Sequence, residues 1–355
     1  MNFRNLSDWG PRIRTTGLVL LSVSLAASVA SVGTLPSSVE MERLYSVGTL
    51  EGDPTEVFGL VQAIAADARG NAFVLDSRMM NVRIIRRGGG VEVPIGRAGA
   101  GPGELAYPID LSLDSRDRLH LLDPGNGRVS VYSTTGESLQ LASDFRIPLH
   151  GEAICHLGER LFMRAFDGAS TIHELDSGGR ILHSFGSLSE EIGAMEMDAS
   201  APGPIACGLS PHHPGGMLVT GSRFRPELNA YTASGERLWT HHLTGFRQVE
   251  MVSRVPGAVT MQQPEEGPHH LITGVHLLPS GRVMVQFGAR TSDTRNRQEI
   301  VHVETRVLAA DGRLSWSSSQ LPRIGAIRRD RAYGIQNLPY PQVTVYRIQE
   351  RETDG

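Results

Sequence analysis

The sequence contains no lysine, so all 34 of its basic residues are arginine. This absence excludes enzymes that form a Schiff base through lysine. It also excludes the phosphate-binding P-loop, whose lysine contacts the phosphates. The 38 acidic residues outnumber the arginines, and the formal net charge is −4. A weakly acidic chain gives no global indication of nucleic-acid binding, so we expect no nucleic-acid partner.

Familiar signatures of hydrolytic and metal-dependent enzymes are missing as well. The sequence contains no Gly-x-Ser-x-Gly, His-Glu-x-x-His or Ser-x-x-Lys pattern. The glycine-rich segment 96–103 departs from the dinucleotide-binding fingerprint, because Glu104 replaces the third glycine and Pro108 follows where a helix should begin. We interpret this segment as a tight connection between structural units. The missing motifs exclude the most easily recognised enzymes and leave catalytic activity undecided.

The N-terminus has the features of an export signal. Arginines precede an apolar stretch over residues 15–32, and small residues at 28–30 fit a cleavage site. We therefore predict a signal peptide over 1–30, a short linker over 31–40 and a mature protein that is periplasmic or extracellular. A retained membrane anchor is the alternative interpretation. After cleavage we expect no stable membrane span.

Two kinds of short glycine or aspartate turn alternate along the chain. The first kind lies near residues 70, 117, 159, 216, 281 and 329, and the second near 89, 136, 179, 235 and 312. Between the turns lie short runs of apolar and β-branched residues, such as Phe73–Leu75 and Val82–Ile85, which are typical of strands. The sequence lacks any sustained helical periodicity. This alternation predicts a fold built from short strands and tight turns.

Six turns of the first kind predict six units of four strands each. A four-stranded unit repeated around an axis is a propeller blade, so we predict an all-β, six-bladed β-propeller. The sixth unit lacks a fourth strand, while an orphan strand over Met41–Val47 lies near the other end of the chain. We predict that this strand, within a closing segment 41–50, joins the last blade. The propeller would then cover 41–350 as a single domain, followed by a tail over 351–355.

The second unit resembles a known repeat. Its segments Gly99–Leu105, Pro108–Asp114 and Leu119–Val129 are similar to an NHL-type repeat, and the first unit keeps part of the pattern at Asp76 and Arg83. The other units keep the turn spacing without these positions. The resemblance implies a six-bladed propeller along most of the chain. It implies little about function, because NHL proteins include scaffolds, ligand-binding proteins and a few enzymes.

Aspartate and arginine recur at matching places in the first two units, as Asp76 with Arg83 and Asp123 with Arg128. Such pairs fit the mouth of a binding site. They also fit a structural turn in which the aspartate accepts backbone hydrogen bonds and contacts the arginine. Repetition in two units favours the structural interpretation, because folds are repeated more often than sites.

Histidine and cysteine supply the remaining candidates for chemistry. His156 and His276 occupy the same place in the first strands of the third and fifth units, but the sequence offers no third histidine in register to complete a zinc site. We expect no cofactor, with Ca²⁺ or Zn²⁺ at the axial channel as the alternative. Cys155 and Cys207 fall at equivalent positions in neighbouring units, so they are candidates for a disulfide. Two small buried residues are the alternative.

A propeller of this kind carries its connections on two faces. The links between units and between second and third strands share one face, which we call the long-loop face; the other turns share the short-turn face. The segments 187–203, 244–270 and 290–299 all belong to the long-loop face. Long loops on a rigid scaffold commonly carry function. Our candidate ligand-binding residues on this face are Arg78, Arg223, Arg225, Arg290, Arg295, Arg297 and Tyr340.

Guanidinium groups bind carboxylates and phosphates through two parallel hydrogen bonds. The sequence therefore predicts an exported, non-catalytic binding or scaffold protein of the cell envelope. Its partner on the long-loop face would be a protein or a small anionic ligand. One alternative is a metal-assisted lyase or lactonase with its site at the axial mouth, and another is a purely structural module. A solvated arginine surface balanced by acidic residues is the simplest alternative for the arginines themselves.

Overall fold

The computed structural model describes residues 38–351, apart from 93–94, 136–137, 188–201, 256–257, 263, 265–266 and 293–297. The predicted signal peptide, most of the predicted linker and the predicted tail apart from Arg351 lie outside the described residues. The described chain is built from strands and turns, without helices. It accordingly offers no helix with the length and apolar character needed to cross a membrane.

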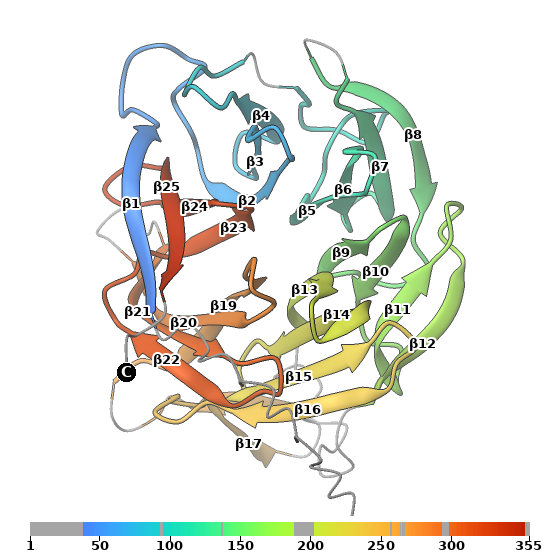
Figure 1. Cartoon of the computed structure of the whole chain (residues 1–355). Helices are drawn as coiled ribbons and strands as arrows, with labels where there is room; N and C mark the ends of the chain where they lie inside the picture. The colour runs from blue at the N-terminus through green and yellow to red at the C-terminus, as the bar shows by residue number, and fades with distance from the viewer. Residues whose placement is uncertain are drawn as a thin grey trace, which may run out of the picture. The chain divides into compact units, whose positions relative to one another are not determined.

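The described strands form six blades around one axis, as a β-propeller (Figure 1). The first blade contains β2 (Val61–Ala66), β3 (Ala72–Asp76) and β4 (Asn81–Ile85). The second contains β5 (Asp110–Leu113), β6 (Leu119–Asp123), β7 (Arg128–Ser133) and β8 (Gln140–Arg146). The third contains β9 (Ala153–Leu157), β10 (Arg160–Arg164), β11 (Ser170–Leu175) and β12 (Ile181–Ser187). The fourth blade contains β13 (Pro202–Ser210), β14 (His213–Ser222), β15 (Glu227–Thr232) and β16 (Arg237–His242). The fifth contains β19 (His270–Leu277), β20 (Val283–Ser292), β21 (Gln298–Leu308) and β22 (Leu314–Ser318). The sixth contains β23 (Ile324–Arg328), β24 (Arg331–Gln336), β25 (Gln342–Arg351) and β1 (Ser38–Val47).

The sixth blade is built from both ends of the propeller sequence. Strand β1 pairs antiparallel with β25 from Ser38 opposite Arg351 to Val47 opposite Val343. In Figure 1 the two strands lie side by side, β1 in blue and β25 in red. The strand begins three residues before the predicted Met41 and ends at Val47, so the segment after Val47 already belongs to the next connection.

The first blade and two long segments differ from the predicted pattern. The fourth position of the first blade is taken by residues that make isolated bridges to β4, from Ile95 to Val82 and from Val91 to Ile85. The segment 244–270, predicted as a loop, contains a hairpin of β17 (Glu250–Val255) and β18 (Ala258–Gln262). The segment 290–299 was also predicted as a loop, but β20 continues to Ser292 and β21 begins at Gln298, so its two ends belong to a longer hairpin, and 293–297 lie outside the described residues.

Each hydrophobic cluster of the propeller lies between two neighbouring blades. Ile64 and Val74 of the first blade pack with Tyr333 and Val345 of the sixth, and five further clusters fill the other five interfaces. Because both faces of a blade pack against neighbours, its strands are apolar on both sides. All five residues of β3 (Ala72–Asp76) are buried. This explains why the strand runs are continuously apolar and do not alternate with polar residues.

The predicted aspartate–arginine pairs differ between the first two blades. In the second, Asp123 accepts backbone hydrogen bonds from Ala106 and Tyr107, but Arg128 lies 3.6 Å from Asp144 and does not pair with Asp123.

The pair of the first blade belongs to a turn. Asp76 accepts hydrogen bonds from the backbone N–H groups of Gly59, Leu60 and Met79, at 2.6, 3.0 and 3.0 Å. The buried Arg83 lies 3.9 Å from the same carboxylate. The structural interpretation of this pair is therefore confirmed. A buried carboxylate that accepts three backbone hydrogen bonds fixes the approach of the chain to the first blade.

Polar side chains tie neighbouring blades together near the axis. The fully buried Gln286 of β20 donates to the Pro322 carbonyl at 2.8 Å and accepts from the Ile324 N–H at 2.7 Å, which joins the fifth and sixth blades. Asn337 joins the sixth blade to the first, because its side chain accepts from the Val61 N–H and donates to the Val61 carbonyl. These amide groups supply between blades the hydrogen bonds that strand pairing supplies within them.

We predict that Gln286→Leu lowers the free energy of unfolding by about 2–4 kcal/mol. The substitution removes the side-chain partner of the buried Ile324 N–H and of the part-buried Pro322 carbonyl, and an unsatisfied buried group costs about 1–3 kcal/mol. Urea unfolding followed by circular dichroism measures the change. The matched control is Gln140→Leu in the exposed strand β8, which should stay within about 0.5 kcal/mol of the wild type. Equal effects of the two substitutions would contradict a bridging role for Gln286.

Candidate functional site

An axial cavity of about 820 Å³ lies inside the ring of inner strands. Its walls come from β2, β5, β9, β13, β19 and β23, the first strand of each blade, which contact one another in a closed ring around the axis (Figure 1). Each inner strand starts at the long-loop face and ends at the short-turn face. A residue's place along its strand therefore gives its depth in the cavity.

The long-loop end of the axial cavity carries charged side chains. Arg223, which follows β14, lies 3.5 Å from Glu152, which precedes β9. The Arg223 side chain is 42% exposed, so its guanidinium can also meet a ligand. Burial raises the pKa of Glu152, and Arg223 opposes that shift. Arg323 and Asn337 line the same end of the cavity.

A second arginine supports this end from within the third blade. Arg164 is fully buried, and its guanidinium donates to the Thr171 hydroxyl at 2.8 Å. Burial lowers its pKa to about 10, while the carboxylate of Glu152 favours the charged form. The positive charge of Arg164 therefore partly offsets the negative charge of Glu152 at the cavity wall.

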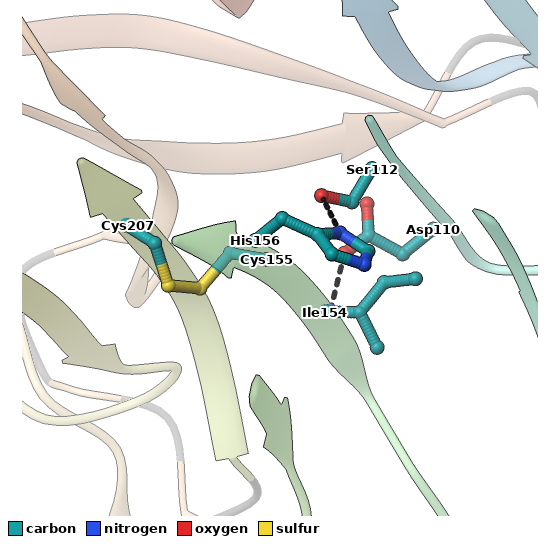
Figure 2. Close-up of a disulfide and its surroundings, with 6 residues drawn as sticks. All are labelled: Asp110, Ser112, Ile154, Cys155, His156 and Cys207. Carbon is teal, nitrogen blue, oxygen red and sulfur yellow. Dashed lines mark hydrogen bonds between the residues drawn. A yellow bond between two sulfur atoms is a disulfide. The ribbon is translucent and has the colours of Figure 1, made fainter. Parts of the chain in front are cut away.

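Asp110 is an acidic residue of the cavity wall whose charge depends on pH near neutrality. Its carboxyl group accepts hydrogen bonds from the backbone N–H groups of Leu111, at 2.9 Å, and Ile154, at 2.8 Å. Burial raises its pKa to about 7, against the lowering effect of these two hydrogen bonds. The contact with Ile154 joins the inner strands of the second and third blades (Figure 2). Asp110 is therefore both a structural tie and a titratable group at the cavity.

Ser112 and His156 lie further along the same two strands. The Ser112 hydroxyl and the His156 Nδ1 are hydrogen-bonded at 2.9 Å (Figure 2). The His156 ring packs against His120 at a centroid distance of 4.2 Å, and His120 Nε2 lies 3.4 Å from Asp114. Burial, with a smaller contribution from His120, lowers the pKa of His156 to about 3. A histidine with so low a pKa is a weak general base at neutral pH, so we assign this pair a structural role.

The second candidate metal ligand, His276, is also engaged. Its Nε2 is hydrogen-bonded to the Ile324 carbonyl at 3.1 Å, and burial lowers its pKa to about 4. Within the described ranges, the structure brings together no group of three or more histidine, cysteine, aspartate or glutamate residues suited to a metal ion. His156 and His276 both line the axial cavity, and each is already hydrogen-bonded to a neighbouring blade.

Cys155 and Cys207 form a disulfide between the inner strands of the third and fourth blades (Figure 2). Their Cα atoms are 5.6 Å apart, within the usual range for a disulfide. Both residues line the axial cavity. The bond gives this interface a covalent tie where the neighbouring interface has the Asp110 and Ser112 hydrogen bonds.

The described residues of the predicted arginine set do not all line the cavity. Arg223 lines the cavity, whereas Arg78 is exposed outside it. Arg225 and Tyr340 are half-buried and do not belong to the cavity lining that the structure describes. Of the other predicted arginines, Arg290 lies in β20, and Arg295 and Arg297 lie outside the described residues.

Five charged residues of the cavity lining were missing from the sequence-based candidates, namely Asp110, Glu152, Arg323, Arg328 and Arg329. Asp110, Glu152 and Arg323 each lie at the start of an inner strand or just before it. The sequence does contain a signal for these three residues. Alignment of the units places each of them at the start of a first strand, which is the long-loop end of the cavity. The sequence could not show which of the two sides of each strand faces the axis.

Comparisons with known proteins support the fold. No protein-family model matches the sequence, and no curated protein matches it significantly. A solved structure of a DUF4221-family member from Bacteroides vulgatus is similar at a TM-score of 0.52 and 10% identity, covering 89% of this chain and 99% of that one. A Bacteroides fragilis protein whose name suggests export is similar at a TM-score of 0.53 and 12% identity, covering 90% and 97%.

A weaker match is virginiamycin B lyase from Staphylococcus aureus, at a TM-score of 0.47 and 9% identity, covering 87% of this chain and 99% of that one. This likeness is too distant for an argument about function. The neighbours agree with the propeller that the NHL resemblance implies. With no family model matching, the similarity to NHL repeats remains a resemblance.

We predict that removing the disulfide in the double variant Cys155→Ser/Cys207→Ser lowers the free energy of unfolding by about 4 kcal/mol. This is the loop-closure entropy for the 52 residues that separate the two cysteines. Guanidinium unfolding under oxidising conditions measures it. Reductant should lower the stability of the wild type and leave the variant unchanged. A wild type equally stable with and without reductant would show that the tie is unimportant.

Asp110 predicts a specific pH dependence. The folded state keeps the carboxyl proton up to about pH 7, whereas the unfolded chain releases it near the ordinary value of 3.8. The stabilisation from the neutral carboxyl is therefore full below about pH 4 and lost as the pH rises to about 7. The difference in unfolding free energy between the wild type and Asp110→Asn should fall over this window and level off above it. Parallel pH profiles of the two proteins would contradict the raised pKa.

Proposed function

We propose that this protein is an exported, non-catalytic binding protein that takes a small anionic ligand into the axial cavity from the long-loop face. The observation that carries the proposal is a cavity of ligand size with arginines at its long-loop end. A volume of about 820 Å³ falls within the range of small-molecule sites. Arg223 and Arg323 would bind the anionic group at that end.

The charges of the lining favour an anion. The lining contains four arginines, Arg223, Arg323, Arg328 and Arg329, and two acidic residues, Asp110 and Glu152. Glu152 is paired with Arg223, and burial raises the pKa of Asp110 to about 7, so part of its population is neutral at physiological pH. The field inside the cavity is therefore positive on balance, which attracts small anions from solution.

Export rests on two independent features. The apolar N-terminal stretch with small residues at 28–30 is typical of a cleaved signal. The disulfide between Cys155 and Cys207 suits an oxidising compartment, where such bonds persist. Both features favour a periplasmic or extracellular protein.

Calorimetric titration of the mature chain with citrate and with inorganic phosphate tests the proposed site. We predict that Arg223→Gln/Arg323→Gln weakens binding of the better probe at least tenfold, because each lost charge-assisted hydrogen bond is worth about 1.5–3 kcal/mol. The control is Arg78→Gln, an exposed arginine of the same face outside the cavity, which should change affinity less than twofold. Equal weakening by the two variants, or no binding of either probe, would overturn the proposal.

A further inference from the structure

The axial cavity extends along the full height of the inner strands. At the long-loop end its lining includes Leu60 and Arg223, which lie just before β2 and just after β14. At the short-turn end it includes Leu209, Arg328 and Arg329, which lie at or beyond the ends of β13 and β23. A ligand could therefore contact side chains at both faces of the ring at once.

The short-turn end carries a second pair of arginines. Arg328 and Arg329 are exposed at the turn after β23, where Arg329 adopts a left-handed conformation with a φ of 54°. Neither forms an ion pair within the part of the chain that the structure describes. The neighbouring Asp330 is exposed and lies outside the lining. The two acidic residues of the lining, Asp110 and Glu152, both belong to the long-loop end.

Several other arginines of the short-turn face are neutralised by acidic partners. Arg118 pairs with Asp114 at 2.6 Å, and Arg282 pairs with Glu350 at 2.7 Å. The same holds for Arg160 with Glu174 on the third blade. Arg328 and Arg329 differ from these three in that they carry positive charge unpaired within the described chain and line the cavity mouth.

The wall between the two ends is largely uncharged. Gln62, Ser112 and Thr273 contribute neutral polar groups there, and Ile64 and Ile327 contribute apolar ones. His156 and His276 are neutral at physiological pH, because burial lowers the pKa of each well below 7. The described lining contains no phenylalanine, tyrosine or tryptophan, so an aromatic ring would find no stacking partner there.

The dimensions suit a narrow, extended molecule. Arg323 and Arg329 stand at opposite ends of β23, and six residue steps along a strand span roughly 20 Å. Spread over this length, the volume of about 820 Å³ corresponds to a mean cross-section of roughly 40 Å². A cavity of this cross-section admits an extended chain molecule. One end of such a molecule would reach Arg223 and Arg323, and the other would reach Arg328 and Arg329.

We infer that the ligand of this cavity is an elongated dianion, with one anionic group held by Arg223 and Arg323 and the other by Arg328 and Arg329. The inference rests on the proposed anion site at the long-loop end and adds a second site at the short-turn end. Once the first anionic group is bound, the second contact is intramolecular, so it raises affinity without a further loss of translational freedom.

Calorimetric titration with two matched series of probes tests this inference. One series contains linear α,ω-alkanedicarboxylates from succinate to tetradecanedioate, and the other contains the monocarboxylates of equal chain length, all below their micelle-forming concentrations. For the mature wild-type chain we expect the dicarboxylate advantage over the matched monocarboxylate to grow with length and to exceed tenfold among the longer members.

The variant Arg328→Gln/Arg329→Gln should reduce the long dicarboxylates to the affinity of the matched monocarboxylates and leave the monocarboxylates unchanged. The control is Arg69→Gln, an exposed arginine of the short-turn face outside the cavity, which should preserve the advantage. Thermal unfolding of each variant verifies that it is folded.

The two levels of the account can fail separately. Binding of both series with equal affinity, or a dicarboxylate advantage that survives Arg328→Gln/Arg329→Gln, would overturn the elongated dianion and leave the proposed anion site in place. An advantage lost equally in Arg69→Gln would assign it to general surface charge and would also overturn the inference. Failure of both series to bind would count against the proposed function itself.

Discussion

The ring of inner strands depends on side-chain contacts between blades, because in the described chain strand pairing stays within each blade. Burial of apolar side chains fills each interface, but it has little directional preference. The relative orientation of neighbouring blades is set by a small number of specific contacts near the axis, which we call ties. Gln286 and Asn337 use amide groups, Asp110 uses a carboxyl group, and Cys155 uses a covalent bond to the next blade. These ties hold six separate sheets at the spacing that leaves a cavity between them.

The same ties determine what the cavity can do. Asp110, Ser112, His156 and His276 all line it, yet each is already hydrogen-bonded to a neighbouring blade. Burial keeps the histidines neutral and leaves Asp110 with a pKa of about 7. The groups that hold the ring together are thus poor candidates for metal ligands or strong bases. The arginines near the two mouths carry the charge, which is why anion binding is the function that the geometry supports best.

Sequence reasoning reached the fold because turns and strand composition are local properties. Six glycine or aspartate turns with apolar runs between them were sufficient to predict six blades. The aligned positions of Cys155 and Cys207 also made them candidate partners, because equivalent residues of adjacent blades are neighbours. The role of Asp110 depended on the Ile154 N–H of the next blade, and no sequence pattern reports such a contact. Loop length was a poor guide too, since both ends of the segment 290–299 continue strands, and among the described candidate arginines Arg223 lines the cavity whereas Arg78 and Arg225 do not.

Anomalous X-ray diffraction from crystals grown with a brominated carboxylate whose C–Br bond is unreactive, such as 4-bromobenzoate, tests the central claim most directly, because it locates the bound anion without assuming its affinity. The account predicts a bromine peak inside the axial cavity, with the carboxylate against Arg223 and Arg323. Peaks confined to exposed arginines outside the ring, such as Arg78, with none inside the cavity, would contradict it.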